Sequence, residues 1–458
     1  MINNAMSVSN FPNKLNNKTS DTGFILLLLV LHIGLGFIGR SYSLFSTFHA
    51  VLTIGLGFYF ALFSKKNKFI VWVTSYIIGA ELFWRMTQAS IFYEAGKYAI
   101  FAILFIAFLR TRRKSSILLP ILYFVMLLIS IPLTLFAHDL SERARQLISF
   151  NLSGPLALCM SVMYFSQIKL NLKDFQAAAW YAVFPIFSIL TISAYSTFSA
   201  ENLKFSTESN FITSGGYGPN QISAILGLGA VFMLVIVLTS KSKFQILMAA
   251  SMTLLFLAQS ALTFSRGGLL NFTACVLTIA FHYVTMTKQR NGGWIFLMGI
   301  AMLGIYLLYP KLDQFTGGLL TQRYQELDFS GRDEKAILEL GVWKENPLLG
   351  VGPGEAAYQT ELLYGNYAVS HTEYTRLLSE HGIPGIAALI LLLIICFNAY
   401  KKAPNWNLRM WTAVLIIWSL VEMSHAAMRI AAISYLIGMA NANWLSDSII
   451  ENNKMKRQ

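Results

Sequence analysis

The most regular feature of the sequence is a succession of long apolar runs separated by short polar segments. The runs are roughly 16 to 24 residues long, and about 20 helical residues cross a hydrocarbon core about 30 Å thick. The runs are continuous rather than alternating, which favours helices over the strands of a barrel. Candidate spans lie near 22–39, 43–64, 69–88, 92–109, 116–137, 147–166, 176–198, 219–239, 244–263, 268–286, 294–309, 383–399, 408–424 and 430–446. We therefore predict an all-α polytopic membrane protein with about 12–14 transmembrane helices, forming one integral membrane domain over residues 1–458.

The composition supports this prediction. Hydrophobic residues make up 55% of the chain and charged residues only 12%, which is about half the charged share of a soluble domain. The three cysteines, Cys159, Cys275 and Cys396, all fall inside predicted spans, which indicates packing rather than disulfides or a metal cluster. Because the sequence has no His/Cys cluster and no paired aspartates with ligand spacing, we expect neither a metal nor another cofactor.

Basic residues decide the orientation of the chain, because positively charged segments stay in the cytoplasm. With the N-terminus inside, the inner segments hold 21 of the 35 basic residues and four of the 22 acidic ones. We therefore predict that both termini are cytoplasmic and that the only long connection, residues 310–384, lies outside. The net charge of +13 is then a topology signal spread over short segments, and it does not indicate nucleic-acid binding.

The outer segment 310–384 carries helix and turn signals. Residues 332–345 predict a helix with an apolar face formed by Ala336, Ile337, Leu340 and Trp343. Asn346-Pro347 ends this helix, and the glycine-rich run 350–354 predicts a tight turn. A second short helix is predicted over residues 355–363.

A third helix is predicted from a capping box, with Ser370 at the N-cap and Glu373 at N3. This helix is expected to end at Gly382, and Arg376 is spaced to pair with Glu373 and Glu380. His371 would then occupy N1, where the helix dipole disfavours protonation and leaves a neutral imidazole able to accept a proton. The alternative interpretation is a surface histidine at the start of a well-capped helix.

Two arginines on the outer side are candidates for binding a diphosphate. Arg266 stands at the junction of two spans and precedes Gly267 and Gly268, which allow a ligand or another backbone to approach closely. Arg332 begins the first helix of the outer segment. A guanidinium matches phosphate oxygens and stays charged. Each arginine also has a simpler interpretation, since Arg266 can anchor a span at the membrane boundary and Arg332 can pair with Asp333.

Ionisable residues also occur within or at the edge of the spans. Glu81 and Arg85 are spaced i,i+4 in one span, and Glu422, His425 and Arg429 form a stripe near the outer end of another. Such residues are costly in a membrane and indicate either a functional site or an ion pair between helices. The remaining histidines His32, His49 and His282 are isolated in the sequence, and we interpret them as packed or interfacial.

Several short motifs occur in a fixed order between residues 215 and 390. They are Gly218-Pro219-Asn220-Gln221, Ser265-Arg266-Gly267-Gly268, Ser330-Gly331-Arg332, Asn346-Pro347-Leu348-Leu349-Gly350-Val351-Gly352-Pro353-Gly354, His371-Thr372-Glu373-Tyr374 and Glu380-His381-Gly382-Ile383-Pro384-Gly385. This order resembles the bacterial O-antigen ligase and O-antigen polymerase superfamily, which are membrane glycosyltransferases of the GT-C type. The resemblance implies a catalytic region over residues 215–390, a periplasmic location for the loop 310–384, and use of undecaprenyl-diphosphate-linked glycans.

The resemblance also implies roles for single residues. Arg266 and Arg332 match the arginines proposed to hold the lipid-linked diphosphate, and His371 matches the histidine proposed to activate the acceptor hydroxyl. The family chemistry is regarded as metal-independent, and we expect an inverting-type transfer. Many relatives have asparagine or serine after this histidine, where this chain has Thr372. Residues at the edges of the same motifs and stripes are further candidates for substrate binding: Asn220, Glu373, Arg376, His425, Arg429 and Arg85.

The expected function is glycan transfer at the periplasmic face of the bacterial inner membrane during synthesis of a surface polysaccharide, such as O-antigen, exopolysaccharide or capsule. The acceptor is a second lipid-linked unit for a polymerase, which we slightly favour, or the lipid A core or a protein for a ligase. Envelope polysaccharide assembly proteins are possible partners. Two other classes stay open: a transporter that flips lipid-linked oligosaccharides, for which the clusters around Glu81 and Glu422 would couple ions, and a non-catalytic scaffold.

Overall fold

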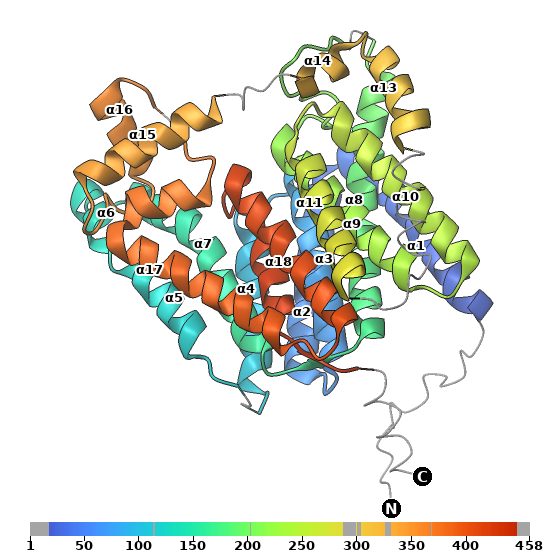
Figure 1. Cartoon of the computed structure of the whole chain (residues 1–458), viewed down its shortest axis with the longest axis horizontal. Coiled ribbons are helices and arrows are strands. Elements are labelled where there is room, and N and C mark those ends of the chain that lie inside the picture. Colours follow the sequence, from blue (N-terminus) through green and yellow to red (C-terminus); the bar gives the residue numbers. More distant parts are fainter. Residues whose placement is uncertain are drawn as a thin grey trace, which may run out of the picture.

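The computed structural model describes residues 18–112, 115–201, 203–286, 299, 304–325, 331–367 and 369–446. Within them, long helices stand side by side in a bundle, and short helices gather at one end of it (Figure 1). The helices of the bundle are α1 (Lys18–Ser41), α2 (Ser43–Phe63), α3 (Asn67–Met86), α4 (Ala95–Leu109), α5 (Leu118–Leu128), α6 (Ile131–His138), α7 (Glu142–Phe165), α8 (Leu172–Ser199), α9 (Pro219–Thr239), α10 (Lys243–Leu262), α11 (Gly267–Met286), α17 (Glu373–Lys402), α18 (Trp406–Ala426) and α19 (Ala431–Ala440).

The short elements of the outer segment are a π-helical turn η1 (Gly304–Leu308), α13 (Tyr309–Phe315), α14 (Leu319–Gln325), α15 (Arg332–Glu345) and α16 (Ala356–Tyr364). In Figure 1, α15 and α16 lie together on the side of α6 and α7, while α13 and α14 lie near α10. Two residues of β1 (Lys169–Leu170) pair in parallel with β2 (Asn443–Trp444). This pairing ties the segment before α8 to the segment after α19.

The predicted fold class is confirmed. Ten helices in the described part are long and apolar enough to cross a membrane, with α5 and α6 counted as one span, Leu118–His138. Three further predicted spans correspond to α4 and α19, which are shorter apolar helices, and to α18, which is not among the ten. The span predicted at 294–309 lies mostly outside the described residues.

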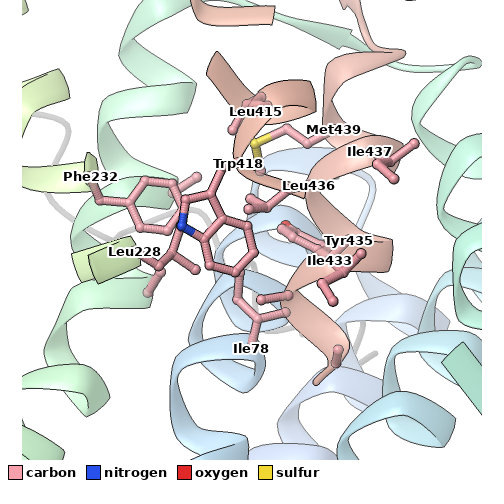
Figure 2. Packing of buried hydrophobic residues seen from close by; sticks show 14 of the residues in the cluster. Ile78, Leu228, Phe232, Leu415, Trp418, Ile433, Tyr435, Leu436, Ile437 and Met439 are labelled. Atoms are coloured by element: carbon pink, nitrogen blue, oxygen red, sulfur yellow. The ribbon is translucent and has the colours of Figure 1, made fainter. Parts of the chain in front are cut away.

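The core of the bundle is built around large buried side chains (Figure 2). Trp418 of α18 is fully buried, and it lies between Phe232 and Leu228 of α9 and Leu436 of α19, with Ile78 of α3 on a further side. Helices in lipid gain no hydrophobic energy from meeting one another, so close packing has to hold them together. Side chains of this size, interlocked across four helices, supply that packing.

Two histidines that appear isolated in the sequence form a hydrogen-bonded chain across α1, α2 and α3. Nε2 of His32 and Nε2 of His49 lie 2.9 and 2.8 Å from the hydroxyl oxygen of Tyr76. The Trp84 indole N–H donates to Nδ1 of His49 at 2.9 Å, and Nδ1 of His32 faces the carbonyl of Leu28 at 2.7 Å. Every polar atom in this chain has a partner, which makes it a structural link between helices.

The first two helices of the outer segment are close to their predicted positions. The helix predicted over 332–345 is α15, and the one predicted over 355–363 is α16, shifted by one residue. The apolar face predicted for α15 does not coincide with its buried face, however. Ile337 is 67% exposed, whereas Glu339 and Val342 are buried, because this helix packs on a polar segment rather than on an apolar core.

The third predicted helix ends at Gly382 as predicted, and the next span continues directly from it across a kink, so that α17 comprises both. Gly382 has φ 58° and ψ −135°, and Pro384 offers no backbone N–H. The carbonyls of Ser379 and Glu380 thereby lose their usual helical donors. They accept instead from the backbone N–H groups of Val351 and Gly352, at 3.0 and 2.9 Å. The glycine-rich turn is therefore a clamp on the kink of α17.

The glycines of this clamp are required by close approach as well as by conformation. Gly350 has φ +69°, and a Cβ there would lie 2.4 Å from the carbonyl carbon of Glu380. A Cβ on Gly382 would lie 2.6 Å from the backbone nitrogen of Gly350. The two segments thus meet backbone to backbone, which only residues without a Cβ permit.

This contact gives a matched pair of variants. Gly365 has φ +67° and open space around its Cβ position, so Gly365→Ala should cost only the left-handed conformation, about 1 kcal/mol. Gly350→Ala adds a backbone clash and should cost ~1–3 kcal/mol more. Unfolding in detergent measures both free energies, and equal losses for the two variants would contradict the clamp.

Candidate functional site

The segment before α17 differs from its predicted capping arrangement. The N-cap of α17 is Thr372, whose hydroxyl accepts from the backbone N–H of Thr375 at 3.2 Å. The prediction of Ser370 as N-cap is wrong, because the Ser370 hydroxyl donates instead to the buried carboxylate of Glu339. His371 therefore precedes the cap and is not at N1. The helix dipole argument for a neutral His371 no longer applies.

A contact with a lysine determines the protonation state of His371 instead. The Lys335 ammonium of α15 lies 3.2 Å from Nε2 of His371. An ammonium has only donors, so it can bond to Nε2 only if that nitrogen carries a lone pair. The contact thus selects the neutral imidazole with its proton on Nδ1. Sequence reasoning missed Lys335, because nothing in its local sequence links it to a histidine so far along the chain.

His371 lines a cavity of about 190 Å³, here called the His371 cavity. It brings together four residues that the sequence analysis had singled out separately, Asn220, His371, His425 and Arg429. They come from the start of α9, the segment before α17, the end of α18 and the turn after it. The other lining residues are Ser209, Phe211, Gly218, Pro219, Gln221 and Ala426.

The motif around Arg266 is fixed against the start of α9. The Ser265 hydroxyl donates to the side-chain oxygen of Asn220 at 2.8 Å. A Cβ on Gly268 would lie 1.9 Å from the carbonyl oxygen of Ser223, and one on Gly267 would lie 2.6 Å from Nε2 of His425. The two glycines therefore allow α11 to approach α9 and let His425 reach the wall of the His371 cavity.

Arg266 itself does not line the cavity. Its guanidinium Nη2 donates to the carbonyl of Arg323 at 2.7 Å, and the buried Arg323 donates from Nε to the carbonyl of Phe264 at 3.2 Å. Phe264 has a positive φ of 57°, a strained conformation of the kind found near functional sites. Arg266 is thus one residue away from Gly267, which lies against His425 of the cavity wall. Arg323, in α14, was not identified from the sequence.

Arg332 is the first residue of α15, and its side chain lies outside the described part of the structure. Its position in the helix can still be compared with that of Lys335. The two residues are spaced i,i+3, so they share one face of α15. Lys335 contacts His371 from that face.

Arg429 faces two cavities. Besides the His371 cavity, it lines a second cavity of about 120 Å³, which Ser370, Glu373, Arg376 and Glu380 also line. Its Nη2 donates to the carbonyl of Ser370 at 2.6 Å. Within the described residues, no carboxylate forms a salt bridge with Arg429. This cation is therefore held beside His371 by a neutral partner.

Arg376 and Glu373 have a different arrangement, since each neutralises the other. The buried Arg376 guanidinium pairs with Glu373 and, at 2.9 Å, with Glu380, and it also donates to the side-chain oxygen of Asn151 in α7 at 3.0 Å. Glu373 accepts from the backbone N–H of Met428 at 3.1 Å. The predicted ion pairs of α17 are present, and they connect α7, α17 and the turn after α18.

Arg85 also lies behind the site rather than in it. It pairs with Glu81 at 2.6 Å, and its Nη1 donates to the side-chain oxygen of Gln221 at 3.1 Å and to the carbonyl of Arg429 at 3.2 Å. Glu81 in turn accepts from the backbone N–H of Ala431 at 2.7 Å. This pair therefore supports two residues of the cavity wall, Gln221 and Arg429.

The stripe on α18 contains one cavity residue and one supporting residue. His425 lines the His371 cavity, and its Nε2 lies 3.6 Å from the carboxylate of the buried Glu422. Glu422 also accepts from the side-chain amide of Asn271 in α11 at 2.5 Å. The carboxylate is thus placed to orient His425 between α11 and the cavity.

The Arg376 network generates a stability prediction. Arg376→Met leaves Glu373 and Glu380 buried without their cation, which should lower the free energy of unfolding by about 3–5 kcal/mol. Arg145→Met breaks an i,i+3 pair with Glu142 in which both side chains are exposed, and it should cause no measurable change. Unfolding of both variants in detergent tests this, and similar stabilities for the two would contradict a structural role for Arg376.

Comparison with known proteins adds independent evidence. Residues 252–390 match the family model described as O-antigen ligase, and no curated protein matches the chain. The matched region contains Arg266, Arg332 and His371, whereas Asn220, His425 and Arg429 complete the cavity from outside it. The match confirms the resemblance of this chain to the O-antigen ligase and polymerase superfamily over residues 252–390.

Proposed function

We propose that this protein is a membrane glycosyltransferase that moves a glycan from undecaprenyl diphosphate to an acceptor hydroxyl at the periplasmic face of the bacterial inner membrane. The observation that carries the proposal is the His371 cavity. It combines an imidazole that keeps its lone pair on Nε2, facing the Lys335 ammonium, with a guanidinium that forms no salt bridge to a described carboxylate. A proton acceptor beside an unneutralised cation suits transfer from a diphosphate leaving group.

His371 is the proposed general base. Its Nε2 carries the lone pair in the arrangement with Lys335. The acceptor hydroxyl would dock on this nitrogen and give up its proton as its oxygen attacks the anomeric carbon. A positioned base of this kind contributes about 10²–10⁴-fold to a rate.

The diphosphate is proposed to bind where positive charge gathers around the cavity. Arg429 supplies one guanidinium, and the start of α9 adds the positive end of its dipole. The superfamily resemblance assigns two further arginines to the diphosphate: Arg266, which precedes the Gly267 that lies against His425, and Arg332, on the face of α15 that carries Lys335. Fixed cations stabilise a charge that grows as the bond breaks.

The proposed reaction is a single displacement. The bond from the acceptor oxygen to the anomeric carbon forms while the bond from that carbon to the diphosphate oxygen breaks. The bonding electron pair leaves with undecaprenyl diphosphate, and the hydroxyl proton moves to Nε2 of His371 and then to water. The configuration at the anomeric carbon inverts. The guanidinium groups supply the positive charge, so the proposal needs no metal ion.

The acceptor defines two versions of this function. We favour a polymerase slightly, in which a second lipid-linked repeat unit provides the hydroxyl and envelope polysaccharide assembly proteins act as partners. The alternative is a ligase that uses the lipid A core or a protein, which agrees with the description of the matched family model. Both versions use the same cavity and the same base.

Replacement of the base is the direct test. In transfer assays with purified protein and a synthetic undecaprenyl-diphosphate glycan, His371→Ala should reduce the rate at least about 100-fold. His138→Ala is the matched control, because His138 pairs with Glu355 and does not line the His371 cavity. Wild-type transfer by His371→Ala would refute the proposed base.

The same assay separates the versions of the function. Glycan transferred to a second lipid-linked unit identifies a polymerase, and glycan transferred to a core lipid or peptide identifies a ligase. If the lipid-linked glycan only changes leaflet in vesicles, the protein is a transporter and the proposal fails.

The cations of the site give a second functional prediction. Arg429→Lys keeps a positive charge but loses the guanidinium fork, and we expect kcat to fall about 10-fold because one charge-assisted hydrogen bond to the leaving group is lost. Arg266→Ala should lower kcat at least as strongly. Arg112→Lys, at the predicted cytoplasmic side, is the control for the conservative exchange. Unchanged kcat in both Arg429→Lys and Arg266→Ala would contradict the proposed role of these arginines in stabilising the leaving group.

A further inference from the structure

Helix α15 holds the segment around His371 through two polar side chains on one face. Lys335 and Glu339 are spaced i,i+4. The Lys335 ammonium contacts Nε2 of His371, while the two carboxylate oxygens of Glu339 accept from the hydroxyls of Ser370 and Thr375. The residues before and after His371 are thus tied to the same helix that contacts its ring.

Lys335 and Glu339 make these contacts instead of a salt bridge with each other. A lysine and a glutamate at i,i+4 can form a salt bridge with each other, yet none joins Lys335 to Glu339 among the described residues. Glu339 is 1% exposed, and each of its carboxylate oxygens accepts a hydrogen bond from a hydroxyl group. Lys335 is thereby left to contact the imidazole.

We propose that Lys335 and Glu339 are positioning residues of the transfer site, which set the tautomer, the charge and the orientation of His371. The inference rests on the proposed function and deepens it. The ammonium keeps the lone pair on Nε2 and makes the imidazolium unfavourable, since two cations would then stand about 3 Å apart. Glu339 fixes the backbone on both sides of the ring through Ser370 and Thr375.

The arrangement has a consequence for the catalytic cycle. The acceptor hydroxyl has to take the place of the ammonium on Nε2, so Lys335 moves aside when the acceptor binds. After the hydroxyl proton reaches Nε2, the ammonium repels the new imidazolium. The proton therefore leaves readily to water, and the neutral imidazole is restored for the next transfer.

Among the described residues, charged groups approach His371 from three parts of the fold. Lys335 and Glu339 face it from α15, His425 and Arg429 line the same cavity from the end of α18 and the turn after it, and Glu373 starts α17 in its pair with Arg376. Burial raises the pKa of the Glu339 carboxyl, and the hydrogen bonds from Ser370 and Thr375 oppose that rise. A pH experiment must therefore distinguish His371 from Glu339.

The pH dependence of kcat/KM for transfer tests Lys335. Without the neighbouring ammonium, protonation of His371 becomes easier and its pKa rises. Because the base must be neutral, the acid limb of Lys335→Met should move to higher pH by about one unit. Lys335→Arg keeps the charge and should leave the limb in place. Lys344→Met removes an exposed lysine from the same helix and should behave like the wild type. An unshifted limb in Lys335→Met would overturn the proposal.

Glu339→Gln tests the other contact and the identity of the titrating group. The amide can accept from only one of the two hydroxyls through its single oxygen, so kcat should fall several-fold while the acid limb persists. Loss of the limb in this variant would assign it to Glu339 and overturn the proposal. Unchanged kcat would overturn the positioning role of Glu339.

Two further measurements distinguish a positioning role of Lys335 from a structural one, and failure of this inference from failure of the proposed function. Thermal unfolding in detergent should show Lys335→Met as stable as Lys344→Met, and a large loss of stability would mean a structural role and overturn the inference. The parent function is judged separately by His371→Ala. If that variant is inactive and Lys335→Met equals the wild type in rate and pH profile, only the inference about Lys335 fails.

Discussion

The buried ion pairs of Arg376 are the interaction on which the geometry of the site depends. A guanidinium inside a helical bundle is expensive, and it is tolerated because Glu373, Glu380 and Asn151 surround it. Through the bond from the Met428 N–H to Glu373, the same network fixes the turn that carries Arg429. The carbonyl of Ser370 then accepts from Arg429. A single charged centre thus sets how the cation and the histidine of the His371 cavity face each other.

The kink of α17 is the second constraint, and it explains the glycine-rich run. Gly382 and Pro384 interrupt the helix, and the carbonyls of Ser379 and Glu380 need other donors. The backbone of residues 350–352 supplies them, which requires contact without intervening side chains. The most recognisable sequence motif of the outer segment therefore has a structural role at this kink. It fixes the helix that follows His371, and the residues that line the His371 cavity come from other elements.

The sequence predicts those parts of the structure that depend on local patterns. Apolar runs place most of the spans, and cap and turn residues place α15 and α16 within one residue. The failures occur where a distant partner competes with a local one. Ser370 is a good N-cap by sequence, but Glu339 takes its hydroxyl and leaves capping to Thr372. Ile337 fits an apolar face, yet α15 buries Glu339 because it packs on a polar segment. Likewise, the meeting of His32 and His49 at Tyr76 depends on how three helices pack.

The same competition separates arginines that pair with carboxylates from Arg429, for which we propose contact with the substrate. Arg85, Arg376 and Arg429 are equal candidates in the sequence. Arg376 and Arg85 lie against carboxylates on their own helices, so a diphosphate would have to displace a buried partner to reach them. Arg429 donates a hydrogen bond to the carbonyl of Ser370, and this neutral partner does not cancel the charge of the guanidinium. Its positive charge remains available at the cavity wall, where an anionic leaving group can neutralise it without unfolding the support behind it. Binding of the lipid-linked glycan would then bring the negative charge that neutralises Arg429 beside His371.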